Sequence, residues 1–264
     1  MKVGEILEYI NELAPWGYAE SWDNVGLMLG SRQSQVNRIL LSMDVTSKVI
    51  KEAVDCGAEL IVSHHPFFFG KLNRLDFDTM KGRQVQTLVT RNISVISAHT
   101  NLDVAEGGVN DTLAETIGLV DPEPLKPYSP SGSKVDLGLG KVGTLKHETE
   151  FSSFLASVKA GLNIGSLRII GAQPEKVQKV GVFCGSFDVE LEYLKGLGLD
   201  AVITGDIKYH TAADAREMGI CILDVGHFAS EHVILEELRK KLSGRFEAVE
   251  AVCSKMESDP FIFA

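Results

Sequence analysis

The chain has 264 residues, of which 44% are hydrophobic and 23% are charged, as expected for a globular protein of one large or two small α/β units. Its net charge of −10 and its lack of basic runs disfavour a nucleic-acid-binding surface. No apolar stretch approaches the roughly 18 residues that span a membrane, and the first residues of the sequence lack the hydrophobic region of a signal peptide. We therefore expect a cytoplasmic protein without a membrane partner. Free thiols are expected at the four scattered cysteines, Cys56, Cys184, Cys221 and Cys253.

The first half of the chain shows an alternation of helical and strand patterns. Hydrophobic spacing predicts helices at 2–14, 46–56, 81–91 and 111–117, and strands at 38–43, 60–63 and 93–98. A polar and aromatic loop, Trp22–Leu27, is expected to lead into a further short strand. Thr46 or Ser47 is expected to cap the second helix, and Gly57 is expected to end it.

Residues 121–140 change in character, because they hold four of the eight prolines together with serines and glycines, and they predict a linker. Beyond them, strands are expected near 142–145, 180–183, 201–204 and 220–223, and helices near 151–162, 189–197 and 229–242. The strand–helix–strand order recurs 141 residues later, with Val180 matching Ile39 and Ile203 matching Val62. We therefore predict an α/β fold of two similar halves, residues 1–124 and 125–264, packed face to face, each a mixed sheet with flanking helices. A chance match of two βαβ units is the alternative.

Two adjacent histidines follow the expected strand at 60–63. Pro66 ends that strand, so His64 and His65 lie at its carboxyl end, where α/β folds commonly bind ligands. Neighbouring residues of a strand point to opposite faces, and a residue before proline is held extended. The two rings are therefore not expected to serve one ion in the same way, although they can reach two. A structural, hydrogen-bonded histidine pair is the alternative.

A second pair of candidate ligands lies near the helix expected over 229–242. Counted back along its leucine stripe, Glu231 belongs to the inward face of this helix, where a carboxylate is costly unless it is paired or bound to a cation. His227 lies four residues earlier and can join it. Alternatively, Glu231 only favours the helix N-terminus electrostatically. His232 falls toward the polar face and is expected to be solvated.

A loop aspartate completes the predicted ligand set. Asp103 follows the strand at 93–98, although a turn or cap role is the usual alternative for such a residue. Five ligands suit two ions about 3.5–4 Å apart, whereas one structural zinc needs four. The set suits two divalent ions among Zn, Mn, Fe, Co and Ni without choosing between them, and water on such ions has a pKa near ~7. The predicted ligands are His64, His65, Asp103, His227 and Glu231.

Several spaced motifs resemble those of the Nif-three-like family, whose members are also called GTP cyclohydrolase I type 2 homologues. The match covers nearly the whole chain, with the motifs in the family's order. They are Trp22–Leu27, Ser63-His64-His65-Pro66, His99–Asp103, Gly226-His227 with Glu231, and Asp259-Pro260-Phe261.

The resemblance implies two intertwined α/β halves, a dinuclear metal centre held by the same five residues, and a toroidal homohexamer. At 264 residues, this chain resembles the short form that lacks an inserted domain. It departs from the family pattern at Gly205-Asp206 with His210, where many members have Gly-Glu and two adjacent histidines; here Tyr209 takes one of those places.

The family name implies a metal-dependent hydrolase that opens the purine ring of GTP, or alternatively one that acts on a phosphate ester. His99, Asp206 or His210 could protonate the ring nitrogen, and a hydrogen-bonding role is the alternative for each. The run Phe67–Phe69 is expected to cover the site, where it could stack a base, or to cover a partner surface; packing in the core is the alternative. A non-catalytic metal-binding adaptor or regulatory protein is a second hypothesis. Nucleic-acid binding through a ring is a third, which the charge disfavours.

Overall fold

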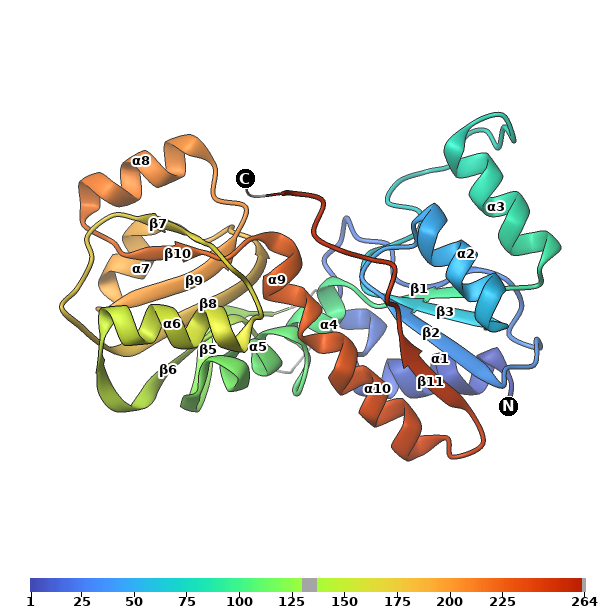
Figure 1. The fold of residues 1–264 in the computed structure, drawn as a ribbon, viewed down its shortest axis with the longest axis horizontal. Helices are drawn as coiled ribbons and strands as arrows, with labels where there is room; N and C mark the ends of the chain where they lie inside the picture. The colour runs from blue at the N-terminus through green and yellow to red at the C-terminus, as the bar shows by residue number, and fades with distance from the viewer. Residues whose placement is uncertain (130–136, 263–264) are drawn as a thin grey trace. The chain divides into compact units, whose positions relative to one another are not determined.

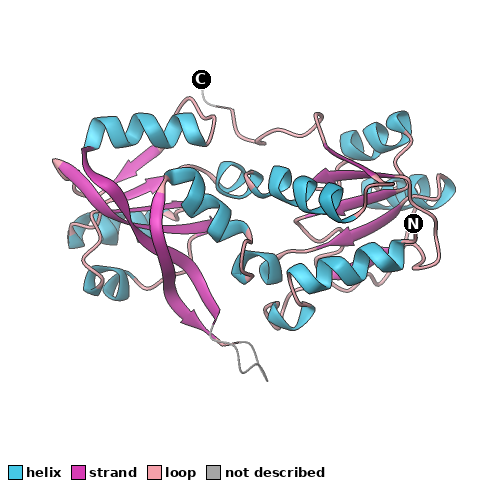
Figure 2. Ribbon diagram, turned by 90° about the horizontal axis from the view of Figure 1, so that it is seen from below, coloured by secondary structure: helices cyan, strands magenta, loops and turns pink. Residues whose placement is uncertain are grey.

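The computed structural model describes residues 1–129 and 137–262. The chain forms two compact units, each built from two separate stretches of the sequence. The first comprises Met1–Glu106 and Leu235–Ser258, and the second comprises Gly107–Ile234 and Asp259–Ala264. Each unit is a mixed sheet with helices on both sides (Figures 1 and 2). The predicted boundary between residues 124 and 125 falls within the strand Leu119–Tyr128 of the second unit. The halves 1–124 and 125–264 describe the repeat in the sequence, and their role as structural halves stays a prediction.

The first unit is built on a five-stranded sheet with the order β1-β4-β3-β2-β11. Its strands β2, β3, β4 and β11 are parallel, and β1 pairs with β4 in the antiparallel sense. In chain order, its elements are α1 (Val3–Leu13), the 3-10 turn η1 (Trp16–Tyr18), β1 (Gly26–Leu29), β2 (Arg38–Ser42), α2 (Ser47–Cys56), β3 (Leu60–Ser63), α3 (Met80–Thr90), β4 (Ser94–Ser97), α4 (Thr100–Val104), α10 (Ile234–Arg245) and β11 (Glu250–Cys253).

Helices cover both faces of this sheet (Figure 1). Alternate strand residues such as Leu40, Ile61 and Val95 pack with α2 and α3 in one buried cluster. The helices α1 and α10 lie on the other face, where the hydroxyl of Tyr9 donates to the carbonyl of Lys241. Because both faces are covered, β2 and β3 carry the apolar runs 39–41 and 60–62, which explains why their positions could be predicted from sequence.

The capping of α2 follows the sequence prediction. The Thr46 hydroxyl accepts from the N–H of Val49, and Gly57 ends the helix in the left-handed conformation at φ 73°. β3 begins three residues after Gly57 and carries the chain straight to His64 and His65.

The second unit is built on a six-stranded sheet with the order β5-β6-β8-β9-β10-β7. The strands β8, β9 and β10 are parallel, and the flanking strands are antiparallel. Its elements are α5 (Val109–Ile117), β5 (Leu119–Tyr128), β6 (Leu137–Glu150), α6 (Phe151–Gly161), β7 (Arg168–Ile170), β8 (Lys176–Ser186), α7 (Leu191–Gly196), β9 (Ala201–Gly205), α8 (Tyr209–Met218), β10 (Ile222–Asp224) and α9 (His227–His232).

The two sheets share one plan at their centres. The parallel set β2-β3-β4 has β1 antiparallel at its edge, and the parallel set β8-β9-β10 has β7 antiparallel at the matching edge. Helices follow the first two strands of each set, α2 and α3 in one unit and α7 and α8 in the other. This order agrees with the predicted repetition of a strand–helix–strand–helix–strand unit.

The linker prediction for residues 121–140 was wrong for the residues that the structure describes. Pro122, Pro124 and Pro127 belong to β5, which pairs with β6 along its length. The strand tolerates three prolines because β5 is the edge of the sheet, where one row of backbone groups needs no partner strand. Residues 130–136, including Pro130, lie outside the described part of the chain.

Two smaller predictions also need correction. The helix expected over 229–242 is two helices, α9 and α10, which are separated at Val233. The segment expected to be a loop at His99–Asp103 contains the short helix α4, for which His99 is the N-cap residue. The four cysteines are free thiols, as predicted. Within the described residues, no helix is long and apolar enough to cross a membrane.

Candidate metal centre

The carboxyl ends of β3 and β4 carry the histidines of the first unit. These strands are parallel neighbours, with Ser63 beside Ser97, so the residues that follow them emerge at the same edge of the sheet. His64 and His65 follow β3, and His99 follows β4. An imidazole nitrogen from each of the three lies within 4.8 Å of the other two.

The rings of His64 and His65 do not obey the strand alternation that the sequence suggested. β3 ends at Ser63, and the two ring centroids are 5.0 Å apart at a tilt of 49°. Backbone N–H groups of both residues still bond to β2 and the residue after it, at the carbonyls of Ser42 and Met43. The pair is therefore fixed by the sheet, yet both rings reach the same region of the first unit.

Each of the three histidines is held at Nδ1 by an oxygen acceptor. Nδ1 of His64 lies 3.0 Å from the carbonyl oxygen of Ala98, and Nδ1 of His65 lies 3.0 Å from Oδ1 of Asp44. Nδ1 of His99 lies 2.9 Å from Oδ1 of Asp23. With the proton at Nδ1 donated to these acceptors, Nε2 keeps its lone pair, which is the tautomer that binds a metal ion.

Asp103 adds a carboxylate to this histidine cluster. It lies on α4, one turn after His99, and its Oδ1 is 3.6 Å from Nε2 of His64. Three imidazoles with one carboxylate form a donor set that suits Zn and the other divalent transition metals. The residues of the first unit therefore fit a metal ion by their chemistry and their spacing.

Asp23 is a supporting residue that the sequence motif contained but for which no role was predicted. Its carboxylate is fully buried, and it accepts hydrogen bonds from His99, from the N–H of Thr100 and from the Thr100 hydroxyl. Burial opposes its ionisation, but the hydrogen bonds from His99 and Thr100 outweigh burial and lower the pKa of Asp23 to about 2. One anion therefore orients a histidine and also satisfies the N-terminus of α4.

The second unit carries His227 and Glu231 on its own helix. α9 begins at His227, directly after β10, and the two side chains are one turn apart with Nε2 of His227 3.0 Å from Oε2 of Glu231. Nδ1 of His227 lies 2.9 Å from Oδ2 of Asp206, which follows β9. Asp206 thus stands to His227 as Asp23 stands to His99. The inward orientation predicted for Glu231 agrees with its burial.

Two glycines make room for α9 at the ends of β8 and β9. A β-carbon at Gly185, which has a φ of 64°, would lie 2.2 Å from Oε1 of Glu231. A β-carbon at Gly205 would lie 2.7 Å from the backbone nitrogen of His227. The N–H of Gly185 also donates to the hydroxyl of Ser230 at 2.9 Å. Glu231 therefore occupies a space that only glycine leaves open.

Two other histidines differ from what the sequence suggested or lie apart from these contacts. His232 was expected to be solvated, but it is half-buried and stacks on Phe228 with centroids 4.7 Å apart, and burial lowers its pKa. The expectation failed because the face of α9 beside Glu231 also packs within the unit. His210, a candidate acid, is exposed on α8 with its ring edge-on to Tyr209.

The aromatic run after Pro66 divides between the alternatives left open by the sequence. Phe67 is buried in the cluster beneath α2 and α3, and Phe68 packs partly against it. Phe69 is exposed, and its ring lies edge-on to His99 at 5.5 Å. Core packing is therefore right for the first residue of the run, and proximity to the histidine cluster is right for the last.

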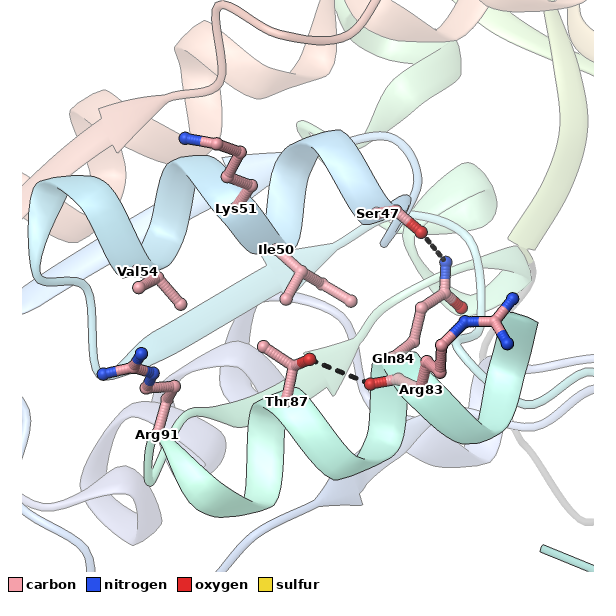
Figure 3. A pocket seen from close by; sticks show the side chains of 8 residues that line it. All are labelled: Ser47, Ile50, Lys51, Val54, Arg83, Gln84, Thr87 and Arg91. Carbon is pink, nitrogen blue, oxygen red and sulfur yellow. Dashed lines mark hydrogen bonds between the residues drawn. The ribbon is translucent and has the colours of Figure 1, made fainter. Parts of the chain in front are cut away.

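A separate cavity of about 310 Å³ lies between α2 and α3 (Figure 3). Its lining includes Lys51, Arg83 and Arg91, together with Gln84, whose amide donates to the hydroxyl of Ser47 at 3.1 Å. Lys51 pairs with Asp55, and Arg83 donates to the carbonyl of Asp78. The lining offers cations but neither imidazole nor carboxylate, so the candidate metal centre is at the histidines and not here.

Comparison with known proteins agrees with the motifs. The model of the Duf34/NIF3 (NGG1p interacting factor 3) family matches residues 1–260. The chain belongs to this family. A Clostridium perfringens protein named GTP cyclohydrolase 1 type 2 homolog is 40% identical over 264 residues, which cover 100% of both chains. The family predicted from the motifs is thereby confirmed.

Two further relatives place the fold and the length of the chain within the family. The crystal structure of a Bacillus cereus protein related to NIF3 matches with a TM-score of 0.92 and 26% identity, over 100% of this chain and 99% of that chain. A Bacillus subtilis GTP cyclohydrolase 1 type 2 homolog is 26% identical over 365 aligned positions, which cover 98% of each chain. Because this chain has only 264 residues, the Bacillus subtilis protein has a segment without a counterpart here, as expected for a short member.

Proposed function

We propose that this protein binds two divalent metal ions and acts as a metal-dependent hydrolase. In this proposal the metal ligands are His64, His65, Asp103, His227 and Glu231. The observation that supports it is the common orientation of the three histidines in this set. Nδ1 of each lies at hydrogen-bond distance from an oxygen acceptor, which leaves Nε2 as the nitrogen that can bind a metal ion. The described residues include groups of histidines and carboxylates that could hold a metal ion.

The chemistry of these residues supports an enzyme with an oriented proton donor. Divalent ions bound here would polarise the substrate and lower the pKa of water. His99 is the candidate that holds and delivers a proton, because its ring belongs to the histidine cluster and Asp23 fixes its orientation. Asp206 fits an orienting role, because its carboxylate accepts from His227. His210, exposed on α8, is the weakest of the three candidates.

The substrate class rests on relatives. Proteins of this family are named GTP cyclohydrolase 1 type 2 homologs, which favours a purine nucleotide whose ring is opened by hydrolysis. A phosphate ester is the alternative substrate, since two-metal centres commonly hydrolyse such esters. A toroidal homohexamer in the cytoplasm belongs to the same proposal and rests on the family resemblance.

A non-catalytic metal-binding adaptor or regulatory protein is the second candidate function. It is favoured by the breadth of the family, which also includes a Drosophila melanogaster protein named NIF3-like protein 1, 31% identical over 99% of this chain and 89% of that protein. A name of that kind states no reaction. Turnover therefore separates the two functions.

The test measures metal content and turnover on the same samples. Wild-type protein, Glu231→Gln and the control Glu237→Gln are loaded with Zn, Mn, Fe, Co or Ni and assayed with GTP and with bis(p-nitrophenyl) phosphate. Glu237 is a glutamate of α10 that pairs with Lys240, so its substitution leaves the proposed ligands intact. We expect turnover in the wild type and the control, and a loss in Glu231→Gln greater than the roughly 10–100-fold that an outer hydrogen-bond partner contributes.

Two results would redirect the proposal. Bound metal without turnover on either substrate class would favour the adaptor or regulatory function. Absence of metal from the wild type after reconstitution would contradict both functions.

A further inference from the structure

Two large aromatic side chains of the first unit are exposed beside the histidine cluster. Trp22 is 59% exposed and Phe69 is 57% exposed, and the rings stack on each other with centroids 6.2 Å apart and planes 17° apart. Leaving two such rings in water forgoes the hydrophobic stabilisation that burial would give. Contiguous exposed apolar surface of this kind is characteristic of a binding site.

Hydrogen bonds on both sides of this pair fix it in place. The residue after Trp22, Asp23, is tied to His99 and Thr100, and the Asn24 amide donates to the carbonyl of Phe68 at 2.7 Å. This last bond joins the loop that carries Trp22 to the loop that carries Phe69. The two rings are thus held as a preformed surface, which lowers the entropic cost of binding a flat ligand.

The aromatic pair adjoins the cluster that would hold the metal. The ring of Trp22 is edge-on to His99 at 6.1 Å and 76°, and that of Phe69 is edge-on to the same imidazole at 5.5 Å and 73°. His99 lies in turn 5.2 Å from His64 and 5.5 Å from His65, measured between ring centroids. A flat group stacked on Trp22 or Phe69 would therefore lie close to His99 and to the histidine cluster.

We propose that Trp22 and Phe69 form a stacking surface that selects ligands with a planar heteroaromatic ring. The inference rests on the proposed function, because it assigns this surface to the ligand handled at the metal centre. Stacking on tryptophan and phenylalanine tolerates many rings, since every nucleobase has a π-face. The surface therefore sets the class of ligand, while the metal centre and His99 act on the group beside it.

The first test uses Trp22 as its own reporter. The chain has two tryptophans, so Trp16→Phe leaves Trp22 as the only one. Metal-loaded Trp16→Phe protein is titrated with GMP, with UMP and with ribose 5-phosphate while tryptophan fluorescence is followed. We expect saturable quenching by at least one of the two ring-bearing probes and none by ribose 5-phosphate, which carries the phosphate but no aromatic ring.

The second test compares affinities by calorimetry in Trp22→Ala, Phe69→Ala and the control Phe77→Ala. Phe77 is a phenylalanine of the same unit that is 48% exposed, so Phe77→Ala removes a ring of similar exposure that does not belong to the proposed surface. We expect the ring-bearing probe to bind about 5- to 150-fold more weakly to Trp22→Ala and Phe69→Ala. This range is the loss of affinity that follows removal of an aromatic ring stacked on a base in other proteins. The control, the metal content of all variants and the affinity for ribose 5-phosphate are expected to stay unchanged.

The outcomes separate this inference from the proposed function. Unchanged affinity for GMP and UMP in both variants, or no quenching of Trp22 by either probe, would overturn the stacking surface while the metal content still supports the centre. A change in oligomeric state of Trp22→Ala or Phe69→Ala, measured by light scattering and without a change in affinity, would identify the pair as a subunit contact and overturn the inference. Wild-type protein without metal would count against the proposed function instead.

Discussion

The two compact units share a strand order but hold their candidate ligands by different physical means. In the first unit, hydrogen-bond acceptors orient three histidines: a backbone carbonyl, Asp44 and the buried Asp23. In the second unit, Asp206 accepts from His227 in the same way, but α9 also lies so close to the sheet that Gly185 and Gly205 are required beneath His227 and Glu231. Candidate ligands at matching strand ends are thus held by hydrogen-bond acceptors in the first unit and, in the second, also by close packing against the backbone. The two units should therefore respond differently to mutation and to pH.

The largest expected effect comes from closing the glycine space of the second unit. Gly185→Ala puts an alanine in the left-handed conformation and places its methyl group against Glu231. Gly198→Ala puts an alanine at a similar φ, but open space surrounds its methyl group. We expect Gly198→Ala to cost about 1–2 kcal/mol of unfolding free energy. Gly185→Ala should cost about 1–3 kcal/mol more and should also lose metal, as measured by urea unfolding and elemental analysis.

This comparison of two glycines at similar φ separates backbone strain from intrusion into the site. Equal losses of stability in the two variants, with metal content retained in Gly185→Ala, would show that Glu231 does not depend on the space that Gly185 leaves open. The difference drawn between the units would then lose its basis in the second unit.

A smaller effect is expected from the hydrogen-bond network of the first unit. Asp23→Asn weakens the acceptor for His99, the proposed proton donor, while keeping the shape of the side chain, and we expect about 10–100-fold slower turnover with metal binding unchanged in a chelator competition assay. Asp44→Asn makes the same change beside His65, a proposed ligand, so it acts on metal binding, but Asp44 is about half exposed and water can replace its contact. Metal binding that falls as much as turnover in Asp23→Asn would contradict the assignment of His99 as a proton donor outside the ligand set.

The central parallel strands of both units and most of the helices between them could be predicted because they depend on local periodicity. His64, His65 and His227 follow buried apolar runs, and Glu231 lies on a helical stripe, so short-range spacing was enough to single them out. Their joint role as ligands stays a prediction. The structure adds that His64, His65 and His99 come together in one unit.

Contacts between distant segments could not be predicted from the same patterns. Asp23 reaches His99 across 76 residues, and the space at Gly185 is defined by Glu231 on a different element. The linker prediction failed because proline breaks interior strands but is tolerated at an edge, and the edge position of β5 depends on the whole sheet order. Sequence patterns therefore singled out the proposed ligands more readily than the residues that orient them.

The smallest expected effect is a pH dependence of the first unit. Burial raises the pKa of Glu257 to about 7 from its ordinary value of 4.5, the charges of Asp44 and Glu52 add to the rise, and the hydrogen bond from Met43 opposes it. The folded protein therefore keeps a proton that the unfolded chain releases, and stability falls as pH rises from about 4.5 to about 7. Glu257→Gln should remove this slope and gain about 1 kcal/mol at pH 8, as measured by urea unfolding.

Asp23 is expected to act with the opposite sign at lower pH. Because its pKa is lowered to about 2 in the folded protein from 3.8, its stabilising contribution is complete above the unfolded value and is lost as pH falls between them. Asp23→Asn should therefore unfold with less dependence on pH in this window than the wild type. Equal pH profiles would show that the contacts of Asp23 with His99 and Thr100 do not depend on its charge.

The number of metal ions bound per chain tests the proposed dinuclear centre most directly. Cobalt-loaded wild-type protein, His65→Asn from the first unit and His227→Asn from the second are freed of loose metal by gel filtration and assayed for cobalt. A dinuclear centre held by the five proposed ligands predicts about two ions per chain in the wild type and fewer in each variant. Two ions in His227→Asn, or none in the wild type, would contradict the proposed ligand set.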